Sequence, residues 1–549
     1  MEKKQKIILI AIAFALVLLC SGLTYAYFTS ATSSESGSSI VAKGGQMNVV
    51  YDNKSANITV SNVYPREEAW VTKKFQVIGN NTTDLLMFYK IKMVVDNNEF
   101  ATDLSYTLTG TNTANSGELI PDITTNAYIG QHDVTLGTGY HVKGTGNVHE
   151  YTLQIFFKPS EEEQNYGQEA NFAAHLVIEI DGTSTKKSPA NWDNAGTNTL
   201  LAGIKKNYAN PTATLTNPIS SGSTSNEAVM SLMPDDYGIS YYFRGNVQNN
   251  FVSFAGMCWR IVRITGDGSI KLTLYDYSSA NCTNTGDDLA FARYSGSNFY
   301  TSFNYLQDPE NDNDNAYIGF MYGTPNSNTY AATHANINKS TILQNLETWY
   351  KAKLTSYTDK LADVIWCNDK STIKNISIDS FNYSGFGYKK EQTLYGSNVR
   401  IAGYADGKHH AYGTGASLIC PNDNDGGKLS KFTVSDTKNG NGNLDYKIGL
   451  LTADEANLAG LAPFSVTMNN YPSLLSYLNE NTKGNDYWSL SPSFFMKDRS
   501  LVWYINDEVN MSGATTDGDA PALRPAIALK SDTTISGGNG TAASPFVVN

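Results

Sequence analysis

The stretch FVSFAGMCWRIVRITGDGSIKLTLYD, residues 251–276, carries a clear signal for the fold. Its runs WRIVRI and SIKLTL alternate in the manner of β-strands. Between them, residues 265–268 read Thr-Gly-Asp-Gly, and glycines supply the positive φ angles that a tight reversal needs. The stretch therefore predicts an antiparallel β-hairpin and favours β-structure for the region around it.

The sequence on both sides of this hairpin extends the pattern into a larger domain. Further strands are predicted in DDYGISYYFRG (235–245) and in the YWSLSPS, LVWYIND and PALRPAIALK segments within 487–530. Ser340 is a suitable N-cap for a helix over about 340–353, and Thr452 for a short helix within 448–460. We expect a mixed α+β domain over residues 235–549.

Upstream, apolar residues recur with period two, as in half-buried strands. The alternating sets are Val71, Phe75 and Val77; Tyr89, Ile91, Met93 and Val95; Tyr151, Leu153, Ile155 and Phe157; and Phe172, Ala174, Leu176, Ile178 and Ile180. Turn signals lie between them, among them Gly137-Thr138-Gly139. Residues 27–182 are therefore predicted to form an antiparallel β-sandwich. Residues 183–234, rich in Thr, Asn, Ser and Pro, are predicted to be a linker with a short helical segment near 200–206.

The N-terminus predicts export. Lys3, Lys4 and Lys6 precede an apolar run over 7–20, and Ala26 is a small residue suited to signal-peptide cleavage. We expect residues 1–26 to be removed and the protein to be extracellular or at the cell surface. The alternative is an uncleaved single-pass anchor, since no charged residue occurs over 7–28.

The composition suits an exported β-rich protein. Charged residues make up only 17% of the chain, whereas about 25% is usual, and the chain contains 34 Tyr. The net charge of −12 argues against nucleic acid as a partner, because phosphate binding requires a basic surface.

The cysteines also agree with export. Cys20 lies in the signal, which leaves Cys258, Cys282, Cys367 and Cys420. We favour disulfides between 258 and 282 and between 367 and 420, because closing the shortest loops costs the least entropy. The alternative is that all four are separate buried thiols.

The first domain resembles the camelysin and TasA group of Gram-positive surface and biofilm-matrix proteins. The resemblance rests on TYAYFTS (24–30), KGGQMNVVY (43–51), NVYPREEAWVTKKFQVIGNNTTD (62–84) and NFAAHLVIEIDG (171–182). It implies a jelly-roll-like sandwich and, in some members, fibres assembled by donation of an N-terminal strand. Ser30 and Pro65-Arg66 depart from the usual pattern of the group, so fibre formation does not follow directly.

The second domain resembles an uncharacterised domain of Gram-positive surface proteins. The resemblance rests on YYFRG, CWRIVRI-x-GDGSIKL, CNDKS (367–371), GLLTADEANLAG, YWSLSPS and LRPAIALK. The late order of Trp, Ser-Pro and Arg-Pro is distantly similar to the C-type-lectin fold, by analogy alone. The resemblance brings no known activity.

No motif for enzymatic chemistry is present. The chain lacks H-E-x-x-H and G-x-S-x-G, and His149-Glu150 has no second histidine four residues after the first. Carboxylates that are distant in sequence, such as Asp454 or Glu455 with a partner elsewhere, would not be visible as a motif. An extracellular hydrolase therefore stays an alternative.

Two groups of residues are candidate sites. Acidic loops are weak calcium candidates, with a solvated loop as the alternative and no other cofactor expected: Asp308, Glu310, Asp312, Asp314, Asp423 and Asp425. Aromatic and polar residues late in the chain are ligand-binding candidates, with core packing of the tryptophans as the alternative: Trp488, Trp503, Tyr504, Asn506 and Asp507. Arg244 and Arg524 are expected to be structural hydrogen-bonding residues.

The sequence thus favours a non-enzymatic exported protein. The sandwich would hold it in an envelope or matrix, while the second domain would bind extracellular or cell-wall carbohydrate, or a matrix protein. One alternative is a structural subunit that self-assembles into fibres or matrix, and the other is an extracellular hydrolase. A membrane contact is expected only through an uncleaved N-terminal segment.

Overall fold

The structure is a computed structural model of the chain. It describes residues 39–42, 45–52, 54–81, 86–100, 103–112, 116–120, 122–129, 134–159, 164, 169–184, 188–209, 211, 223, 227–305, 314–373, 376–378, 381–383, 385–402, 404–405, 408–409, 415–422, 429–463, 476–482, 484–496, 498–506, 510–517 and 521–549. The predicted export signal and the cleavage site after Ala26 lie outside these residues. In the part of the chain that is described, no helix is both long and apolar enough to cross a membrane.

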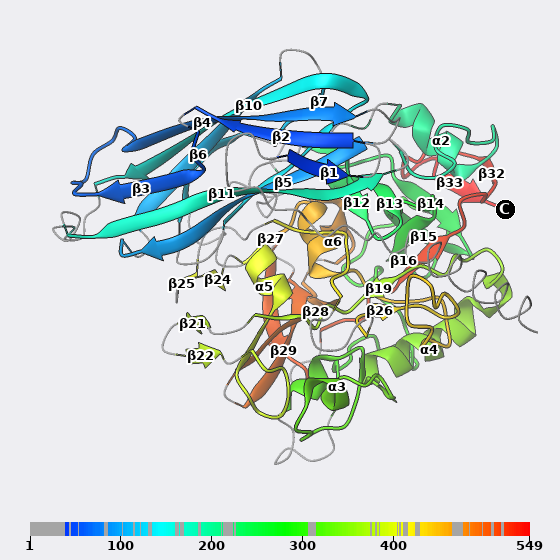
Figure 1. Cartoon of the computed structure of the whole chain (residues 1–549). Coiled ribbons are helices and arrows are strands. Elements are labelled where there is room, and N and C mark those ends of the chain that lie inside the picture. Colours follow the sequence, from blue (N-terminus) through cyan, green and yellow to red (C-terminus); the bar gives the residue numbers. More distant parts are fainter. Residues whose placement is uncertain are drawn as a thin grey trace, which may run out of the picture.

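The described residues between 39 and 184 form a β-sandwich, which lies above the rest of the molecule in Figure 1. One sheet has the order β1 (Ser39–Ala42), β2 (Gly45–Tyr51), β4 (Val71–Asn81), β10 (Gly144–Phe157), β6 (Leu104–Thr111) and β8 (Ile123–Tyr128). The facing sheet has the order β3 (Asn57–Ser61), β11 (Asn171–Ser184), β5 (Leu86–Asn98), β9 (Val134–His141) and β7 (Gly117–Glu118). All pairings within these sheets are antiparallel.

The core of the sandwich follows from the alternation in its strands. Tyr89, Ile91 and Met93 of β5 are buried on the same face, and so are Leu153 and Ile155 of β10 in the opposite sheet. Because successive side chains point to opposite faces, period-two apolar residues fill the space between the sheets. The predicted antiparallel sandwich and the predicted mainly β fold are confirmed.

The expected turn at 137–139 is not a turn. These residues lie inside β9, where Gly137 has a φ of +138°. The register of β5 and β9 shifts at this point, between Ile91 and Lys92. The glycine therefore accommodates a β-bulge in a continuous strand, a use of glycine that cannot be told from a turn by sequence alone.

The described residues from 188 onward form a larger unit with its own sheets and helices. Its first sheet contains β12 (Ala228–Asp235), β13 (Gly238–Gly245), β15 (Met257–Ile264), β14 (Phe251–Phe254), β33 (Phe546–Val548) and β32 (Ile535–Gly537) in that order, with β16 (Ile270–Asp276) between β15 and β31 (Ala526–Leu529). Its second sheet has the order β20 (Thr372–Ile373), β23 (Thr393–Tyr395), β28 (Tyr487–Met496), β29 (Arg499–Ile505), β30 (Asn510–Thr515) and β27 (Ala462–Pro463).

Short pairs and helices complete the larger unit. The pairs are β17 (Met321–Tyr322) with β18 (Asn338–Lys339), β19 (Trp366–Cys367) with β26 (Lys431–Phe432), β21 (Ile376–Ile378) with β22 (Phe381–Tyr383), and β24 (Tyr404–Ala405) with β25 (Lys408–His409). The α-helices are α2 (Leu200–Asn207), α3 (Tyr330–Thr333), α4 (Thr341–Lys353), α5 (Gly396–Ile401) and α6 (Ala453–Leu458). Single 3₁₀ turns are η2 (Asn315–Ile318), η3 (Thr355–Tyr357) and η4 (Tyr477–Asn479).

The hairpin and both helix starts lie where the sequence predicts them. Strands β15 and β16 pair antiparallel, and Gly268 in the turn between them has a φ of +87°. The Ser340 hydroxyl accepts a hydrogen bond from the N–H of Leu343 at 3.2 Å, as an N-cap does. Thr452 and Glu455 form a reciprocal capping box at the start of α6.

Parts of the segment 183–234, predicted as a linker, belong to the larger core. Helix α2 is close to the expected short helix, and its residues Leu200, Leu201 and Ile204 are buried in that core with Trp192. Most of β12 also falls in this segment. The apolar residues here are too few to give a period, so their burial is visible only from the tertiary structure.

Candidate functional site

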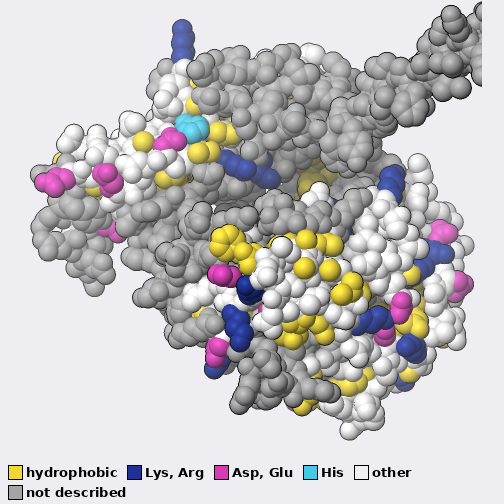
Figure 2. Space-filling model, turned by 60° about the horizontal axis from the view of Figure 1, so that its bottom comes forward, with side chains coloured by type: hydrophobic (Ala, Val, Ile, Leu, Met, Phe, Trp, Pro, Cys, Tyr) yellow, Lys and Arg dark blue, Asp and Glu magenta, His cyan; other side chains and the backbone are white. Residues whose placement is uncertain are grey.

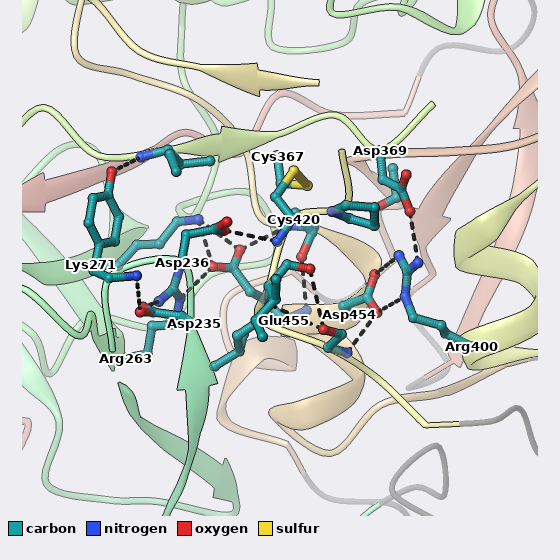
Figure 3. A pocket seen from close by; sticks show the side chains of 18 residues that line it. Asp235, Asp236, Arg263, Lys271, Cys367, Asp369, Arg400, Cys420, Asp454 and Glu455 are labelled. Carbon is teal, nitrogen blue, oxygen red and sulfur yellow. Dashed lines mark hydrogen bonds and ion pairs between the residues drawn. A yellow bond between two sulfur atoms is a disulfide. The ribbon is translucent and has the colours of Figure 1, made fainter. Parts of the chain in front are cut away.

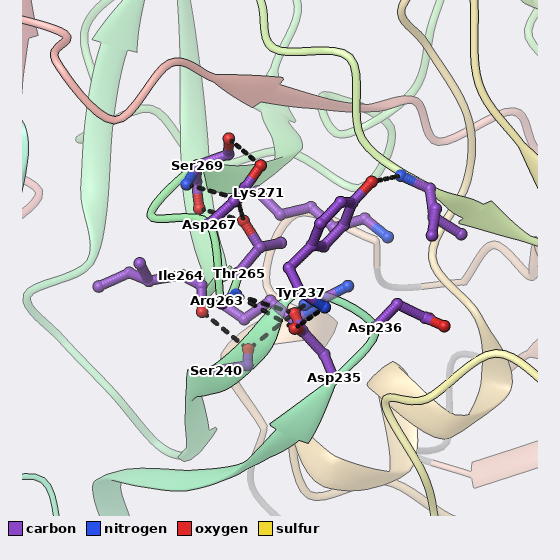
Figure 4. A network of polar contacts seen from close by, with 12 residues as sticks. Asp235, Asp236, Tyr237, Ser240, Arg263, Ile264, Thr265, Asp267, Ser269 and Lys271 are labelled. Atoms are coloured by element: carbon purple, nitrogen blue, oxygen red, sulfur yellow. Dashed lines mark hydrogen bonds and ion pairs between the residues drawn. The ribbon is translucent and has the colours of Figure 1, made fainter. Parts of the chain in front are cut away.

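Asp235, at the end of β12, joins two tight turns (Figure 4). Its carboxylate accepts hydrogen bonds from the N–H groups of Tyr237 and Gly238, at 2.8 and 3.1 Å, in its own hairpin. It accepts a third from the N–H of Gly266, at 3.1 Å, in the turn between β15 and β16. A Cβ atom at Gly266 would lie 2.3 Å from the nitrogen of Gly238, so the close approach of the two turns requires glycine.

Arg263 of β15 joins two carboxylates inside the larger unit. Its Nη1 lies 2.6 Å from Oδ2 of Asp235, and its Nε lies 2.8 Å from Oε1 of Glu455. Lys271, directly opposite Arg263 in the hairpin, has its Nζ 2.7 and 2.8 Å from the two oxygens of Glu455. The same Nζ lies 4.4 Å from the centroid of the Trp366 ring. Four charged side chains are thus paired away from water.

Helix α6 brings a second carboxylate into the same region. Asp454, the neighbour of Glu455, forms a bidentate pair with Arg400, with Nε to Oδ1 at 2.7 Å and Nη2 to Oδ2 at 2.9 Å. Arg400 also lies 2.8 Å from Oδ2 of Asp369 through its Nη1. The capping box explains this placement, because it fixes the first turn of α6, where both acidic residues lie.

A disulfide between Cys367 and Cys420 forms one wall of the region, with its Cα atoms 5.6 Å apart. The N–H of Cys420 donates to Oδ2 of Asp236 at 2.8 Å. The other oxygen of Asp236 lies 2.6 Å from Nζ of Lys431. The disulfide and this ion pair together hold the segment 415–422 against the rest of the site.

The second disulfide joins Cys258 and Cys282, with Cα atoms 5.4 Å apart, next to Phe251 and Tyr275. The predicted pairing, which closes the shortest loops, is therefore the one that the structure shows. Two such bonds fit an oxidising environment, because disulfides are rare in reducing compartments.

The charged residues surround a small cavity, shown in Figure 3. The cavity is lined by Asp235, Asp236, Tyr237, Arg263, Lys271, Ile365, Cys367, Asp369, Arg400, Ser417, Leu418, Ile419, Cys420, Pro421, Thr452, Asp454, Glu455 and Ser491. The centre of a water molecule can occupy only about 20 Å³ of it. That is room for about one or two waters, and a sugar ring does not fit.

Burial and pairing move the pKa values of the cavity residues in opposite directions. Burial raises the pKa of Asp235 to about 6, against the lowering effects of Arg263 and of the N–H groups of Tyr237 and Gly266. Burial also acts to raise the pKa of Glu455, but the charges of Lys271 and Arg263 outweigh it and lower that pKa to about 2. Burial lowers the pKa of Lys271 to about 8 although Glu455 opposes the shift.

The predicted ligand-binding group is not a surface site. Trp488 and Trp503 are 1% and 4% exposed, and both belong to the large hydrophobic core. Their indole N–H groups donate to the carbonyl of Thr301 at 2.7 Å and to Oγ of Ser397 at 3.0 Å. Core packing, the alternative reading, is correct because each ring removes a large apolar area from water.

The other described members of the predicted ligand-binding group do not form an exposed binding site either. Tyr504 and Asn506 are half-buried, and Asn506 accepts a hydrogen bond from the N–H of Asn510 at 3.1 Å through its side chain. Asp507 lies outside the described residues.

The calcium candidates are mostly not described: Asp308, Glu310, Asp312, Asp423 and Asp425 lie outside the described residues. Asp314 is fully buried and caps η2, where its carboxylate accepts hydrogen bonds from the N–H groups of Ala316 and Asn326 at 2.8 and 2.7 Å. No cluster of three or more His, Cys, Asp or Glu suited to a metal ion occurs within the described residues. The Asp314 carboxylate is therefore occupied by hydrogen bonds to nearby backbone N–H groups.

Arg244 and Arg524 have the structural role expected of them. Nε of Arg244 lies 2.8 Å from Oε1 of Glu227, and its Nη1 donates to the carbonyl of Asn457 at 2.9 Å. Arg524 donates to the carbonyl of Leu274 at 3.0 Å. Both guanidinium groups are buried among these acceptors.

Sequence reasoning did not identify the charged cluster as a site, although it named Asp454 and Glu455 as carboxylates that motifs would miss. One signal was available in the hairpin itself. Arg263 and Lys271 interrupt runs that are otherwise suited to burial, and a buried cation requires a partner of opposite charge. The partner, Glu455, is far along the chain, so its identity depends on the fold.

No protein-family model and no curated protein matches the chain. Among solved structures, a match is found to an 11S globulin from Wrightia tinctoria, described as revealing an auxin binding site. The match has 9% identity, covers 40% of this chain and 67% of the globulin chain, and has a TM-score of 0.08. A similarity this weak carries no argument about fold or function.

Proposed function

We propose that the chain is a non-enzymatic protein of the cell surface or extracellular matrix, and that its larger unit binds an extracellular or cell-wall carbohydrate. The sandwich, which resembles the camelysin and TasA group, would hold the protein in the envelope or matrix. The two disulfides support a location outside the cytoplasm. The apolar segment after Lys6 supports export.

The state of the carboxylates in the cavity supports the non-enzymatic reading most directly. Each of the cavity's acidic residues is within 2.8 Å of a basic side chain: Asp235, Asp236, Asp369, Asp454 and Glu455. A general acid must hold a proton and a nucleophile must reach its substrate. A space of about one or two waters admits no substrate, and the Glu455 carboxylate, with its pKa lowered to about 2, holds no proton near neutral pH.

The surface also supports a neutral polymer as the ligand. Figure 2 shows one face of the molecule, on which the described side chains are mostly uncharged and Lys, Arg, Asp and Glu are scattered. With 34 Tyr and a charged fraction of 17%, the chain offers rings and neutral hydrogen-bonding groups more than charge. Such groups suit sugar rings, which present apolar C–H faces and hydroxyl edges.

Co-sedimentation with insoluble polysaccharides and isolated cell walls tests this proposal. The purified chain is expected to sediment with at least one polymer and to stay bound at high salt, because screening weakens charge contacts and leaves stacking intact. Failure to bind any polymer, together with polymerisation of the purified chain, would favour the structural fibre subunit instead.

One observation favours the extracellular hydrolase as a second candidate. Asp235 and Glu455 share Arg263, and their pKa values of about 6 and about 2 are far apart. Pairs of carboxyl groups with separated pKa values are typical of acid and base catalysts. This candidate requires the cavity to open widely enough to admit a substrate.

A further inference from the structure

A cluster of aromatic side chains lies at the surface of the larger unit between β16 and α4 in the sequence. We call Tyr277, Tyr294, Phe299 and Tyr300 the tyrosine platform. Tyr300 is 43% exposed and the other three are half-buried. The rings of Phe299 and Tyr300 pack against each other, with centroids 4.2 Å apart and planes 32° apart, so that Phe299 supports the exposed ring of Tyr300.

The guanidinium group of Arg293 packs against two rings of the platform. The guanidinium carbon of Arg293 lies 4.0 Å from the centroid of Phe299 and 4.6 Å from that of Tyr277, so that both rings pack on one planar group. Its Nη2 lies 2.6 Å from Oδ2 of Asp288. The positive charge is therefore compensated within the protein and the rings are held in place.

Amide side chains fix the tyrosines further. The Nδ2 of Asn298 donates to the hydroxyl of Tyr294 at 2.9 Å, and that hydroxyl donates to the carbonyl of Tyr300 at 2.5 Å. The hydroxyl of Tyr300 donates to Oδ1 of Asn485. Side chains that are ordered before binding lose little conformational entropy on binding, so this platform is preorganised for a ligand.

The chemistry around the platform selects the ligand. Asn298, whose Oδ1 accepts a hydrogen bond from the N–H of Tyr300 at 3.2 Å, and the exposed Ser295 and Ser297 of the same segment supply neutral hydrogen-bonding groups. The exposed Asp287 would repel an anionic polymer. An aromatic face next to amides and hydroxyls complements the apolar face and the hydroxyl groups of a neutral sugar ring.

We propose that the tyrosine platform is the site at which the larger unit binds a neutral polysaccharide, with the ring of Tyr300 stacked on a sugar. The proposal rests on the proposed function and assigns it to named residues. No platform residue lines the charged cavity.

Co-sedimentation of the full chain with cellulose, chitin and an insoluble α-glucan tests the assignment. Tyr300→Ala is expected to weaken binding to the retained polymer about tenfold, because one aromatic stacking contact accounts for a loss of that order. Tyr300→Phe keeps the ring and is expected to bind within about twofold of the unchanged chain. Tyr305→Ala, which removes a tyrosine that is 66% exposed outside the platform, is the matched control and should bind normally.

The outcomes distinguish a wrong assignment of the binding site from a wrong proposed function. If the chain binds a polymer and Tyr300→Ala binds it equally well, the platform is not the site, while the proposed function stands. If the unchanged chain binds none of the polymers, both proposals are contradicted. Thermal unfolding of each variant, compared with the unchanged chain, excludes a loss of binding through loss of fold.

Discussion

Glu455 compensates two buried cations at once. Its oxygens lie within 2.8 Å of both Arg263 and Lys271, and all three side chains are at most 7% exposed. A buried charge is tolerated only with a partner, because leaving water is costly for an ion. The carboxylate is therefore needed for the stability of the larger unit whatever that unit binds.

Replacing this carboxylate should have a large effect on stability. Glu455→Ala leaves Arg263 and Lys271 without this partner and is expected to lower the free energy of unfolding by about 3–5 kcal/mol. Urea unfolding of the larger unit, followed by tryptophan fluorescence, measures the change. The control is Asp445→Ala, because Asp445 is 63% exposed in its pair with Lys339 and should lose less than about 1 kcal/mol. Equal, small losses in both variants would contradict the account.

For single residues, the sequence predicts contacts between near neighbours in the chain better than contacts between residues far apart in the chain. The caps at Ser340 and Thr452 are correct because a cap depends on the next three residues alone. The charged cluster is different, since Glu455 and its partner Lys271 are 184 positions apart. No local rule links two such residues, so the fold must be known first.

Two buried histidines connect the two sheets of the sandwich. His141 of β9 belongs to one sheet and His149 of β10 to the other, and their ring centroids are 4.1 Å apart. Both residues are fully buried. Nδ1 of His149 shares a hydrogen bond with the hydroxyl of Tyr89 at 2.6 Å, and that hydroxyl shares another with Tyr151.

The histidine pair should make the sandwich sensitive to acid. Burial, and then the neighbouring charge of His149, lower the pKa of His141 to about 3, and burial lowers that of His149 to about 4, from 6.5. Below 6.5 the unfolded chain therefore takes up protons that the folded chain does not, and stability falls as the pH drops toward 4. Hydrogen exchange of the β9 and β10 segments at pH 7.5, 6 and 4.5 measures this.

A double variant, His141→Gln with His149→Gln, isolates the effect because glutamine does not ionise in this range. Its protection should depend less on pH than that of the unchanged chain. His175→Gln is the control, since His175 is partly exposed and pairs with Asp96. Equal protection of the unchanged sandwich at pH 7.5 and 4.5 would contradict the prediction.

The two disulfides should each stabilise the larger unit. Removing Cys367–Cys420 by a double Ser replacement is expected to cost about 2–4 kcal/mol, because the bond restricts the unfolded chain. Removing Cys258–Cys282 should cost slightly less, since its sequence separation is 24 and that of the other bond is 53. Denaturant unfolding gives both values, and alkylation of the native chain should label none of these cysteines.

Strands were predictable where period two is sustained, as in β5, and the hairpin of β15 and β16 where Gly-Asp-Gly separates two runs rich in apolar residues. The order of strands within a sheet was not, because β4 pairs with β2 and β10 rather than with its neighbours β3 and β5. The tryptophans of β28 and β29 show the same limit. Their spacing fits a binding surface or a core equally well, and only packing decides in favour of the core.

The sandwich and the larger unit are in direct apolar contact. Leu86 and Phe88 of β5 belong to the core of the larger unit together with Trp192 and Tyr241. Figure 1 shows the sandwich resting on the larger unit along this side. An apolar contact of this kind favours a fixed arrangement of the units, so that a platform on the larger unit keeps its position relative to the sandwich.

We propose that the chain binds a polysaccharide and does not degrade it. Chromatography of the soluble sugars released when the chain is incubated with a polymer that retains it tests both parts of this proposal together. We expect binding and no release above the level without protein, because the carboxylates of the cavity are paired and the space is small. Release of shorter sugars in proportion to protein, abolished in an Asp235→Asn variant that still binds the polymer, would contradict the account and identify the chain as a hydrolase.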